Sequence, residues 1–181
     1  MILVIYFDIF HKDLERRLQE NNIPYKLVKY DDLINENHTD YKTIIICGSR
    51  KRILRDNDLP LLDPYLKQDN HIIGICFGFQ FLALKSGGEI EERELFRGIR
   101  LDRRLDRRSV DQRLDRRSVD HMSLYYNHHD CITYLPPTWT IIQKIDGFIN
   151  IASTNKWIGF QFHPEKNNAT FRHYLLPFLR L

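Results

Sequence analysis

The chain has 181 residues, which is enough for one domain with a full hydrophobic core. Its hydrophobic content of 43% and charged content of 28% are typical of a soluble globular protein, and its formal net charge of +3 is too small to indicate a nucleic-acid partner. No apolar run approaches the ~18 residues of a membrane span. Three cysteines, an odd number spread along the chain, argue against a disulfide framework and predict a reducing, cytoplasmic compartment.

The first half of the sequence alternates predicted strands with predicted helices. Strands are indicated by short runs rich in apolar and β-branched residues, at residues 2–7, 25–28, 43–47 and 72–75. The first run is too short for a signal peptide and lacks a leading positive charge. Helices are predicted over residues 12–20, 60–68 and from 79 to the Gly87-Gly88 pair. This alternation predicts an α/β fold, a three-layer sandwich with a mostly parallel central sheet covered on both faces.

The second half of the sequence has strands without helices between them. They are predicted at residues 123–127, 140–145, 149–153 and 157–162. Their short connections predict a mixed or antiparallel extension of the same sheet. Residues 171–179 predict a closing helix with Leu175, Phe178 and Leu179 facing inward.

A charged repeat separates the two halves. Residues 104–111 recur as residues 113–120, and a partial copy precedes them at 100–103. One interpretation is a basic patch for phosphate or nucleic acid, and the other is a local duplication that lengthened a surface loop. Arginine is largely balanced by aspartate and no aromatic residue is present to stack on a base, which favours the duplication. We therefore expect a single domain over residues 1–181 with a charged insertion at about 100–120.

Cys76 lies between a predicted strand and a predicted helix, in the sequence Gly74-Ile-Cys-Phe-Gly78. A strand, a sharp turn and a helix with a nucleophile at the apex make a nucleophile elbow, in which the glycines avoid a clash between strand and helix. The N-terminus of the helix would favour a thiolate there. The alternative is a buried core cysteine beside two packing glycines, because free cysteine is among the most buried residue types.

A cysteine nucleophile needs a base and a group that orients the base. His163 directly follows a predicted strand, and Pro164 stiffens its link to Glu165, whose carboxylate can fix the imidazole tautomer. Active sites in parallel sheets lie beyond the carboxyl ends of the strands, where Gly48 and Cys76 also fall. His163, Glu165 and Cys76 together supply the parts of a catalytic site, which favours a catalytic role for His163 over that of an ordinary core histidine.

A second histidine-rich stretch covers residues 127–131 and competes for the role of the base. Its His128, His129 and Cys131 could also suggest a metal site. Adjacent residues of a strand point to opposite faces, so His128 and His129 could hardly share one ion. The sequence therefore predicts no metal, and no other motif indicates a cofactor.

The two motifs resemble a known pair of signatures. Gly74-Ile-Cys-Phe-Gly-Phe-Gln80 and Gly159-Phe-Gln-Phe-His-Pro-Glu165 look like those of the class I glutamine amidotransferases, in the same order and at a similar separation. Residues 127–136 look like the corresponding stretch of the GMP synthase amidotransferase domain. The resemblance covers most of the chain except the repeat, and it implies a flavodoxin-like sheet.

The resemblance also implies residue roles. Cys76 would attack the side-chain amide of glutamine, His163 would move the proton to the leaving ammonia, and Glu165 would orient His163. The backbone N–H groups of Gly48 and Phe77 would form the oxyanion hole. The substrate pocket would further contain Gln80, Asn127 and His128.

This sequence departs from the family pattern at four places. The loop after the third strand reads Gly48-Ser-Arg50 instead of Gly-Gly-Pro, and a serine restricts the backbone more than glycine does. Asp8-Ile-Phe10 replaces the usual N-terminal turn. Phe79 stands where His or Met is common and is predicted to be a packing position. Asn127 replaces a serine of the GMP synthase stretch.

The sequence contains no Gly-rich phosphate loop, and we expect no ATP-binding module to follow residue 181. We therefore expect a glutaminase subunit that passes ammonia to a separate ATP-dependent synthetase, of the kind that converts XMP to GMP. One alternative is a stand-alone hydrolase of γ-glutamyl compounds with the same three catalytic residues. Another is a catalytically silent regulatory protein on the same fold, since fold does not guarantee function.

Overall fold

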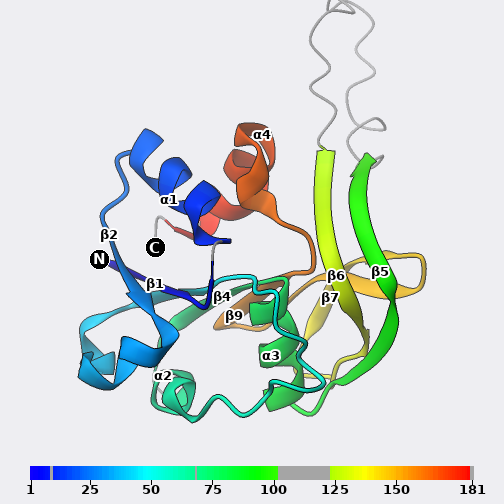
Figure 1. Cartoon of the computed structure of the whole chain (residues 1–181), viewed down its shortest axis with the longest axis horizontal. Helices are drawn as coiled ribbons and strands as arrows, with labels where there is room; N and C mark the ends of the chain where they lie inside the picture. Colours follow the sequence, from blue (N-terminus) through cyan, green and yellow to red (C-terminus); the bar gives the residue numbers. More distant parts are fainter. Residues whose placement is uncertain (9, 68, 102–122, 180–181) are drawn as a thin grey trace, which may run out of the picture.

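The computed structural model describes residues 1–8, 10–67, 69–101 and 123–179 (Figure 1). Within these residues, seven strands form one sheet in the order β2-β1-β3-β4-β9-β8-β7. Neighbours from β2 to β9 are parallel, whereas β8 and β7 are antiparallel to their neighbours. The strands are β1 (Ile2–Tyr6), β2 (Tyr25–Lys29), β3 (Thr43–Ile46), β4 (His71–Ile75), β7 (Thr140–Ile145), β8 (Phe148–Ser153) and β9 (Trp157–Phe160). The prediction of a mostly parallel central sheet is confirmed.

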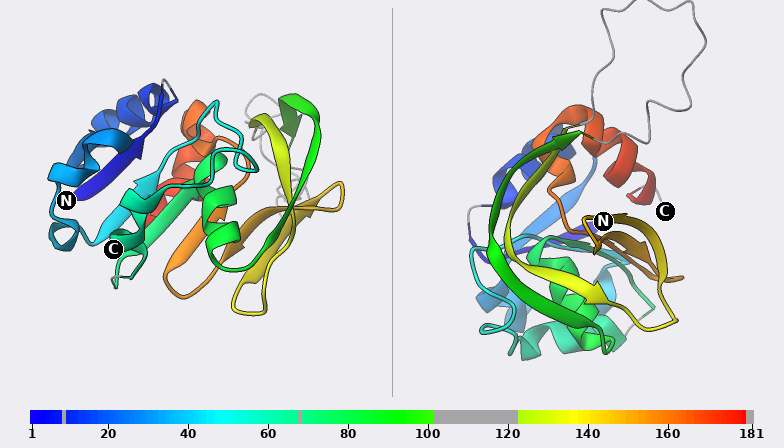
Figure 2. Two further views of the ribbon diagram at one scale, coloured as in Figure 1. Left: turned by 60° about the horizontal axis from the view of Figure 1, so that its bottom comes forward. Right: turned by 90° about the vertical axis from the view of Figure 1, so that its right-hand side faces the viewer.

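Helices cover both faces of this sheet. Helix α1 (His11–Glu20) and the C-terminal helical segment lie on one face, and α2 (Asp63–Lys67) and α3 (Phe77–Lys85) lie on the other (Figures 1 and 2). Alternate side chains of β1 enter different cores: Leu3 joins the core beneath α3, and Val4 joins the core beneath α1. The strands are apolar on both faces because both are buried, which confirms the three-layer prediction.

The helical segments differ in detail from the prediction. Pro60 begins a 3-10 turn (Pro60–Leu62) that leads into α2. The C-terminal segment begins earlier than predicted, at α4 (Asn168–Thr170), because the side chain of Asn167 caps it by accepting a hydrogen bond from the Thr170 N–H. It continues through a π-helical turn (Phe171–Leu175) and a 3-10 turn (Leu176–Phe178). Its predicted inward residues do pack against the core, namely Leu175, Phe178 and Leu179.

Two further strands form a separate antiparallel ribbon, β5 (Glu89–Leu101) and β6 (Ser123–Tyr134) (Figure 2). The prediction that residues 123–127 extend the central sheet is therefore wrong, because β6 pairs with β5 instead. The residue pattern does not predict β5, since this strand is largely exposed and carries many charged side chains. The expected insertion at about 100–120 begins inside β5, and both full copies of the repeat, residues 104–111 and 113–120, lie outside the described residues.

The chain crosses from the central sheet to the ribbon directly after β9. The Gln161 N–H donates to the Asn150 carbonyl of β8 at 2.9 Å, whereas the His163 N–H donates to the Tyr125 carbonyl of β6 at 2.8 Å. This crossing ends the strand at Phe160, two residues earlier than predicted. His163 therefore does not directly follow β9, and its backbone is held by the ribbon.

No helix in the described ranges has the length and apolarity needed to cross a bilayer.

Phe79 is fully buried, as expected for a packing position, and its ring lies against the backbone of Gly159 in β9. A Cβ at position 159 would lie 1.8 Å from Phe79 Cδ2. We expect Gly159→Ala to lower the free energy of unfolding by about 1–3 kcal/mol in urea denaturation, because a closely packed ring has no room to withdraw. Gly98→Ala is the matched control, since a Cβ there meets nothing within 4 Å. An equal loss from Gly159→Ala in a Phe79→Leu background would contradict this account.

Candidate active site

Cys76 sits at the apex between β4 and α3 in a rare backbone conformation. Its φ of 51° and ψ of −104° lie in a region that non-glycine residues seldom adopt, at a cost of about 1–3 kcal/mol. A Cβ at Gly74 would lie 2.6 Å from the Phe79 backbone nitrogen, and one at Gly78 would lie 2.1 Å from the Ile46 carbonyl oxygen. Both glycines are thus required for strand and helix to approach, which is the geometry of a nucleophile elbow.

His163 and Glu165 form a buried pair next to this apex. The Nδ1 of His163 lies 2.7 Å from Oε1 of Glu165, and both side chains are about as buried as the core. Burial lowers the pKa of His163, but the negative charge of Glu165 and the contact with Cys76 outweigh burial and raise this pKa to about 10. The Nε2 of His163 has no hydrogen-bond partner within the described part of the chain. Glu165 therefore orients the ring through Nδ1, and Nε2 remains available to exchange a proton.

Gly48 lies between the cysteine and the histidine. A Cβ on Gly48 would lie 2.7 Å from His163 Cε1 and 3.6 Å from Cys76 Cβ. The absence of a side chain at this position lets the imidazole ring occupy the space beside the thiol. The ring of Phe10 stacks on the ring of His163, with centroids 5.3 Å apart and an interplanar angle of 22°. His163 is thus confined by the chain that follows β1 and by the chain that follows β3.

Asp8 compensates for the serine in the loop after β3. The carboxylate Oδ2 of Asp8 accepts hydrogen bonds from Ser49 Oγ at 3.1 Å and from the Arg50 N–H at 2.7 Å. Ser49 Oγ in turn accepts from the Lys51 N–H at 3.0 Å. The φ of Ser49 is not positive, so no glycine is needed there. Two departures from the family pattern, the N-terminal turn and this loop, therefore stabilise each other.

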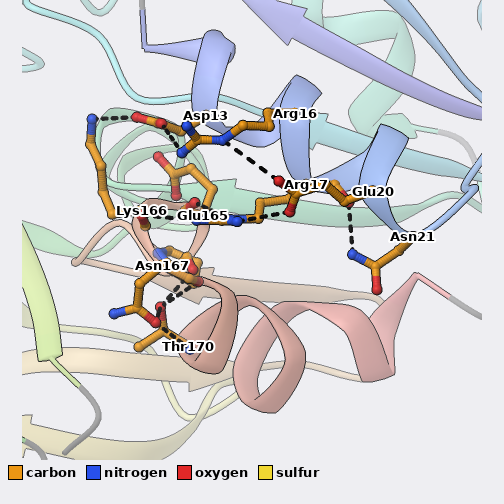
Figure 3. A network of polar contacts seen from close by, with 10 residues as sticks. Asp13, Arg16, Arg17, Glu20, Asn21, Glu165, Lys166, Asn167 and Thr170 are labelled. Carbon is orange, nitrogen blue, oxygen red and sulfur yellow. Dashed lines mark hydrogen bonds and ion pairs between the residues drawn. The ribbon is translucent and has the colours of Figure 1, made fainter. Parts of the chain in front are cut away.

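The turn Pro164–Lys166, which carries Glu165, is anchored by two helices (Figure 3). Arg17 of α1 donates to the carbonyl oxygens of Glu165 and Lys166, both at 3.3 Å, and Lys166 pairs with Asp13 at 2.6 Å. Thr170 of α4 is fully buried, and its Oγ1 donates to the Pro164 carbonyl at 2.7 Å. These contacts fix the position of the carboxylate that orients His163.

A cavity of about 240 Å³ opens beside Cys76. Its walls come from the loop after β3, from α3 and from the middle of β6. The predicted pocket residues Gln80, Asn127 and His128 all line it, together with Ser49, Arg50, Lys51, Arg52, Leu95, His129 and Asp130. Phe77, the first residue of α3, is buried directly after Cys76. The structure thus brings the predicted site residues to one place.

Some of these side chains are already engaged. Gln80 Nε2 donates to the Asp130 backbone carbonyl at 2.6 Å, and the Cys76 thiol lies 3.8 Å from the Asn127 carbonyl oxygen. Burial and the charge of His163 lower the pKa of His128 to about 4, so its imidazole is neutral at pH 7. The side chain of Gln80 thus joins α3 to the ribbon as well as facing the cavity.

Sequence reasoning did not single out the ion pair of Arg52 and Asp130. Arg52 Nη2 lies 2.6 Å from Asp130 Oδ1, and the Ile53 N–H donates to Asp130 Oδ2 at 3.0 Å. Asp130 is buried and belongs to β6, so this pair ties the loop after β3 to the ribbon across the cavity. The sequence shows Asp130 within the histidine-rich stretch, but it does not show that Arg52 is its partner.

The described residues hold no cluster of three or more side chains suited to a metal ion. Cys131 Sγ lies 3.7 Å from His128 Nδ1, but His129 is not part of this contact.

Comparison with known proteins places this geometry in a family. Residues 3–179 match the family model of the class-I glutamine amidotransferases. The chain belongs to this family. Its α/β fold with the Cys76 elbow is therefore that of a class I amidotransferase, a family of glutamine-hydrolysing enzymes.

This amidotransferase is similar to curated GMP synthases. It is 26% identical over 183 residues to the glutamine-hydrolysing GMP synthase of Malacoplasma penetrans, covering 90% of this chain and 32% of the relative. It is 28% identical over 185 residues to that of Thermus thermophilus, covering 91% of this chain and 33% of the relative. The chain thus spans about a third of the length of these relatives.

Solved structures share the fold. The crystal structure of a Thermoplasma acidophilum protein assigned as a GMP synthase subunit has a TM-score of 0.74, with 20% identity, and covers 99% of this chain and 92% of that one. A glutamine amidotransferase of Thermotoga maritima has a TM-score of 0.63, with 19% identity, and covers 98% of this chain and 81% of that one.

The buried pair makes stability depend on pH. The pKa of His163 in the folded state, about 10, lies above the ordinary value of 6.5. The pair therefore stabilises the fold fully below about pH 6.5, and this contribution is lost as the pH rises through about 10. We expect the free energy of unfolding of the wild type to fall over this range more steeply than that of the double variant His163→Gln/Glu165→Gln. Chemical denaturation at a series of pH values measures both, and parallel curves would contradict the shift.

Proposed function

We propose that Cys76, His163 and Glu165 form a catalytic triad that hydrolyses glutamine to glutamate and ammonia. The observation that carries this proposal is the approach of Cys76 and His163 beside Gly48, with Glu165 in contact with the imidazole and the 240 Å³ cavity next to Cys76. A nucleophile at a strained turn, a base beside it and a carboxylate behind the base are the parts that covalent acyl transfer requires.

In the first half of the reaction, Cys76 Sγ forms a bond to the side-chain carbonyl carbon of glutamine. The electron pair of the C=O bond moves to oxygen, and the N–H groups of Gly48 and Phe77 bind the oxyanion. Protonated His163 gives its Nε2 proton to the nitrogen. The C=O bond re-forms, the C–N bond breaks, and ammonia leaves behind a glutamyl thioester.

In the second half, neutral His163 takes a proton from water while the water oxygen bonds to the thioester carbon. The C–S bond then breaks, which releases glutamate and returns Cys76 as a thiolate beside protonated His163. Glu165 accepts the Nδ1–H hydrogen bond throughout and stabilises the imidazolium. The raised pKa of His163 suits the first step, because it keeps a proton available for the poor leaving group.

The cavity offers matching groups for the amino-acid end of glutamine. The basic loop from Arg50 to Arg52 forms one wall and suits the α-carboxylate. Carbonyl and amide oxygens of Asn127 and Gln80, which also line the cavity, suit the α-ammonium group. Neutral His128 lines the cavity without adding a charge. The Arg52–Asp130 pair would hold both walls at a fixed separation.

We further propose that the ammonia passes to an ATP-dependent synthetase of the GMP synthase type. The support for this step is the similarity to curated GMP synthases over nine tenths of this chain. The acceptor, XMP in that reaction, would bind the synthetase and not the cavity beside Cys76.

Replacement of Cys76 tests the triad. We expect Cys76→Ala to abolish glutamine hydrolysis, and a glutamine-analogue chloromethyl ketone to label Cys76 of the wild type, as located by peptide mass spectrometry. Burial raises the pKa of Cys131 to about 11 and holds that of Cys47 well above its ordinary value, so these thiols stay protonated at neutral pH. Cys131→Ala should therefore be labelled like the wild type. Full hydrolysis by Cys76→Ala would refute the triad, and no reaction at Cys76 would indicate a silent protein.

The hydrolysis assay also distinguishes a stand-alone hydrolase of γ-glutamyl compounds from a glutaminase subunit. Turnover of γ-glutamyl peptides well above that of glutamine, with no synthetase present, would favour that alternative.

A methyl group at position 48 tests the geometry around the base. Gly48→Ala would place Cβ 2.7 Å from His163 Cε1, and the ring is held by Glu165 and Phe10. We expect the displaced imidazole to reduce kcat for glutamine by about a hundredfold, since a shift of about 1 Å can cost that much. Gly98→Ala, at an open position, should keep the wild-type kcat. Equal activity of the two variants would show that the ring does not act from this place.

A further inference from the structure

A second cavity, of about 360 Å³, lies on the other side of β6 from the catalytic one. Its walls are the ribbon β5–β6, the β7–β8 hairpin and the crossing segment after β9, and Figure 1 shows this ribbon and hairpin adjacent to one another. Phe96, Tyr126 and Phe148 supply aromatic surface, and Gln161 and His128 supply polar groups. The volume falls in the range of small-molecule sites. The proposed triad does not use this cavity.

Gln161 is the unusual feature of the lining. The residue is 2% exposed, yet neither its amide oxygen nor its amide nitrogen has a hydrogen-bond partner among the described residues. Its backbone N–H is fixed by the Asn150 carbonyl. Burying an unpaired amide is costly, so native proteins rarely leave both atoms unmatched. The side chain therefore keeps one acceptor and one donor group without a partner at the cavity wall.

The polar neighbours of Gln161 are matched without it. Tyr126 Oη donates to Asn150 Oδ1 at 2.9 Å, and Asn150 Nδ2 donates to Gln143 Oε1 at 2.6 Å. These three side chains form a chain of hydrogen bonds that does not include Gln161. The Nε2 of His128 is the other buried polar atom of the lining that lacks a partner in the described residues. Its low pKa keeps this imidazole neutral at pH 7.

Charged side chains also line the cavity, and the two arginines among them are already paired. Arg100 lies over the ring of Phe96 at 4.5 Å and pairs with Asp146. Arg93 lies over the ring of Phe148 at 4.9 Å and pairs with Glu91. Each guanidinium thus already has a carboxylate and an aromatic face. The cavity therefore suits a neutral, planar ligand more than an anion.

We propose that this cavity binds a nucleobase, with the Gln161 amide pairing with a ring N–H and the adjacent C=O while Phe96 and Phe148 contact the ring. A glutamine side chain matches such an edge with two hydrogen bonds, as it does when amides read bases in nucleic acids. Aromatic rings provide contacts that every base can use. The inference concerns a binding site separate from the proposed triad and stands without it. His128 lines both cavities, so a bound base would lie one side chain away from the catalytic pocket.

Nucleosides with and without a blocked edge test the proposal on the wild-type chain. Isothermal titration and saturation-transfer NMR should detect inosine and uridine at millimolar concentration or below. We expect 1-methylinosine and 3-methyluridine, whose ring N–H is replaced by a methyl group, to bind about tenfold to hundredfold more weakly, as the loss of a two-bond contact predicts. Absence of binding by all four, which would mean that the cavity holds water only, overturns the proposal. Equal binding of the blocked and unblocked forms overturns it as well.

A variant locates the site. Gln161→Leu keeps the approximate volume and removes the unpaired amide, so we expect a melting temperature equal to or above that of the wild type and a tenfold or greater loss of inosine affinity, about the value of such a contact. Gln19→Leu, on the exposed side of α1, is the control and should bind like the wild type. A folded Gln161→Leu variant with unchanged affinity would refute the site. If this variant does not fold, the comparison of blocked and unblocked nucleosides still decides.

Discussion

The close approach of β3, β4 and α3 is the constraint on which the site depends. Gly74 and Gly78 let the helix pack directly on the strand backbones, and the turn between them forces Cys76 into a strained conformation. Packing offsets the strain, because nearly all residues of α3, including its phenylalanines, are buried in the core. A flexible loop could hold a cysteine, but it could not hold the thiol against the imidazole. The core therefore stabilises the geometry that the chemistry needs.

The remaining parts of the site reach the apex from separate elements. The segment after β1 contributes Asp8 and Phe10, the segment after β3 contributes Gly48, and the turn after β9 contributes His163 and Glu165. Parallel strands make this possible, because their carboxyl ends meet at one edge of the sheet. The ribbon adds the substrate side of the cavity. The proposed catalytic groups thus lie in turns beyond the carboxyl ends of the sheet strands, and the residues that line the cavity come from the loop after β3, from α3 and from β6.

The sequence predicts the parts of the structure that depend on local pattern. The β-branched runs predict the central strands, and the spacing of glycines around Cys76 predicts the elbow. The pairing of β6 with β5 was not predictable, because β5 is exposed on much of its surface and lacks the alternation of a half-buried strand. The partnership of Ser49 with Asp8, 41 residues apart, and that of Arg52 with Asp130, 78 residues apart, were not predictable either. Such contacts depend on tertiary packing, which no local pattern records.

The contacts between α1 and the Pro164–Lys166 turn can form only late in synthesis on the ribosome. Arg17 and Asp13 contact residues about 150 positions later in the chain, so their partners are among the last to be synthesised. A nascent chain contains the β4–α3 segment early, while the imidazole and its carboxylate are still missing. The thiol at the apex therefore remains without its base until the polypeptide is almost finished. Incomplete chains would then lack the proposed triad.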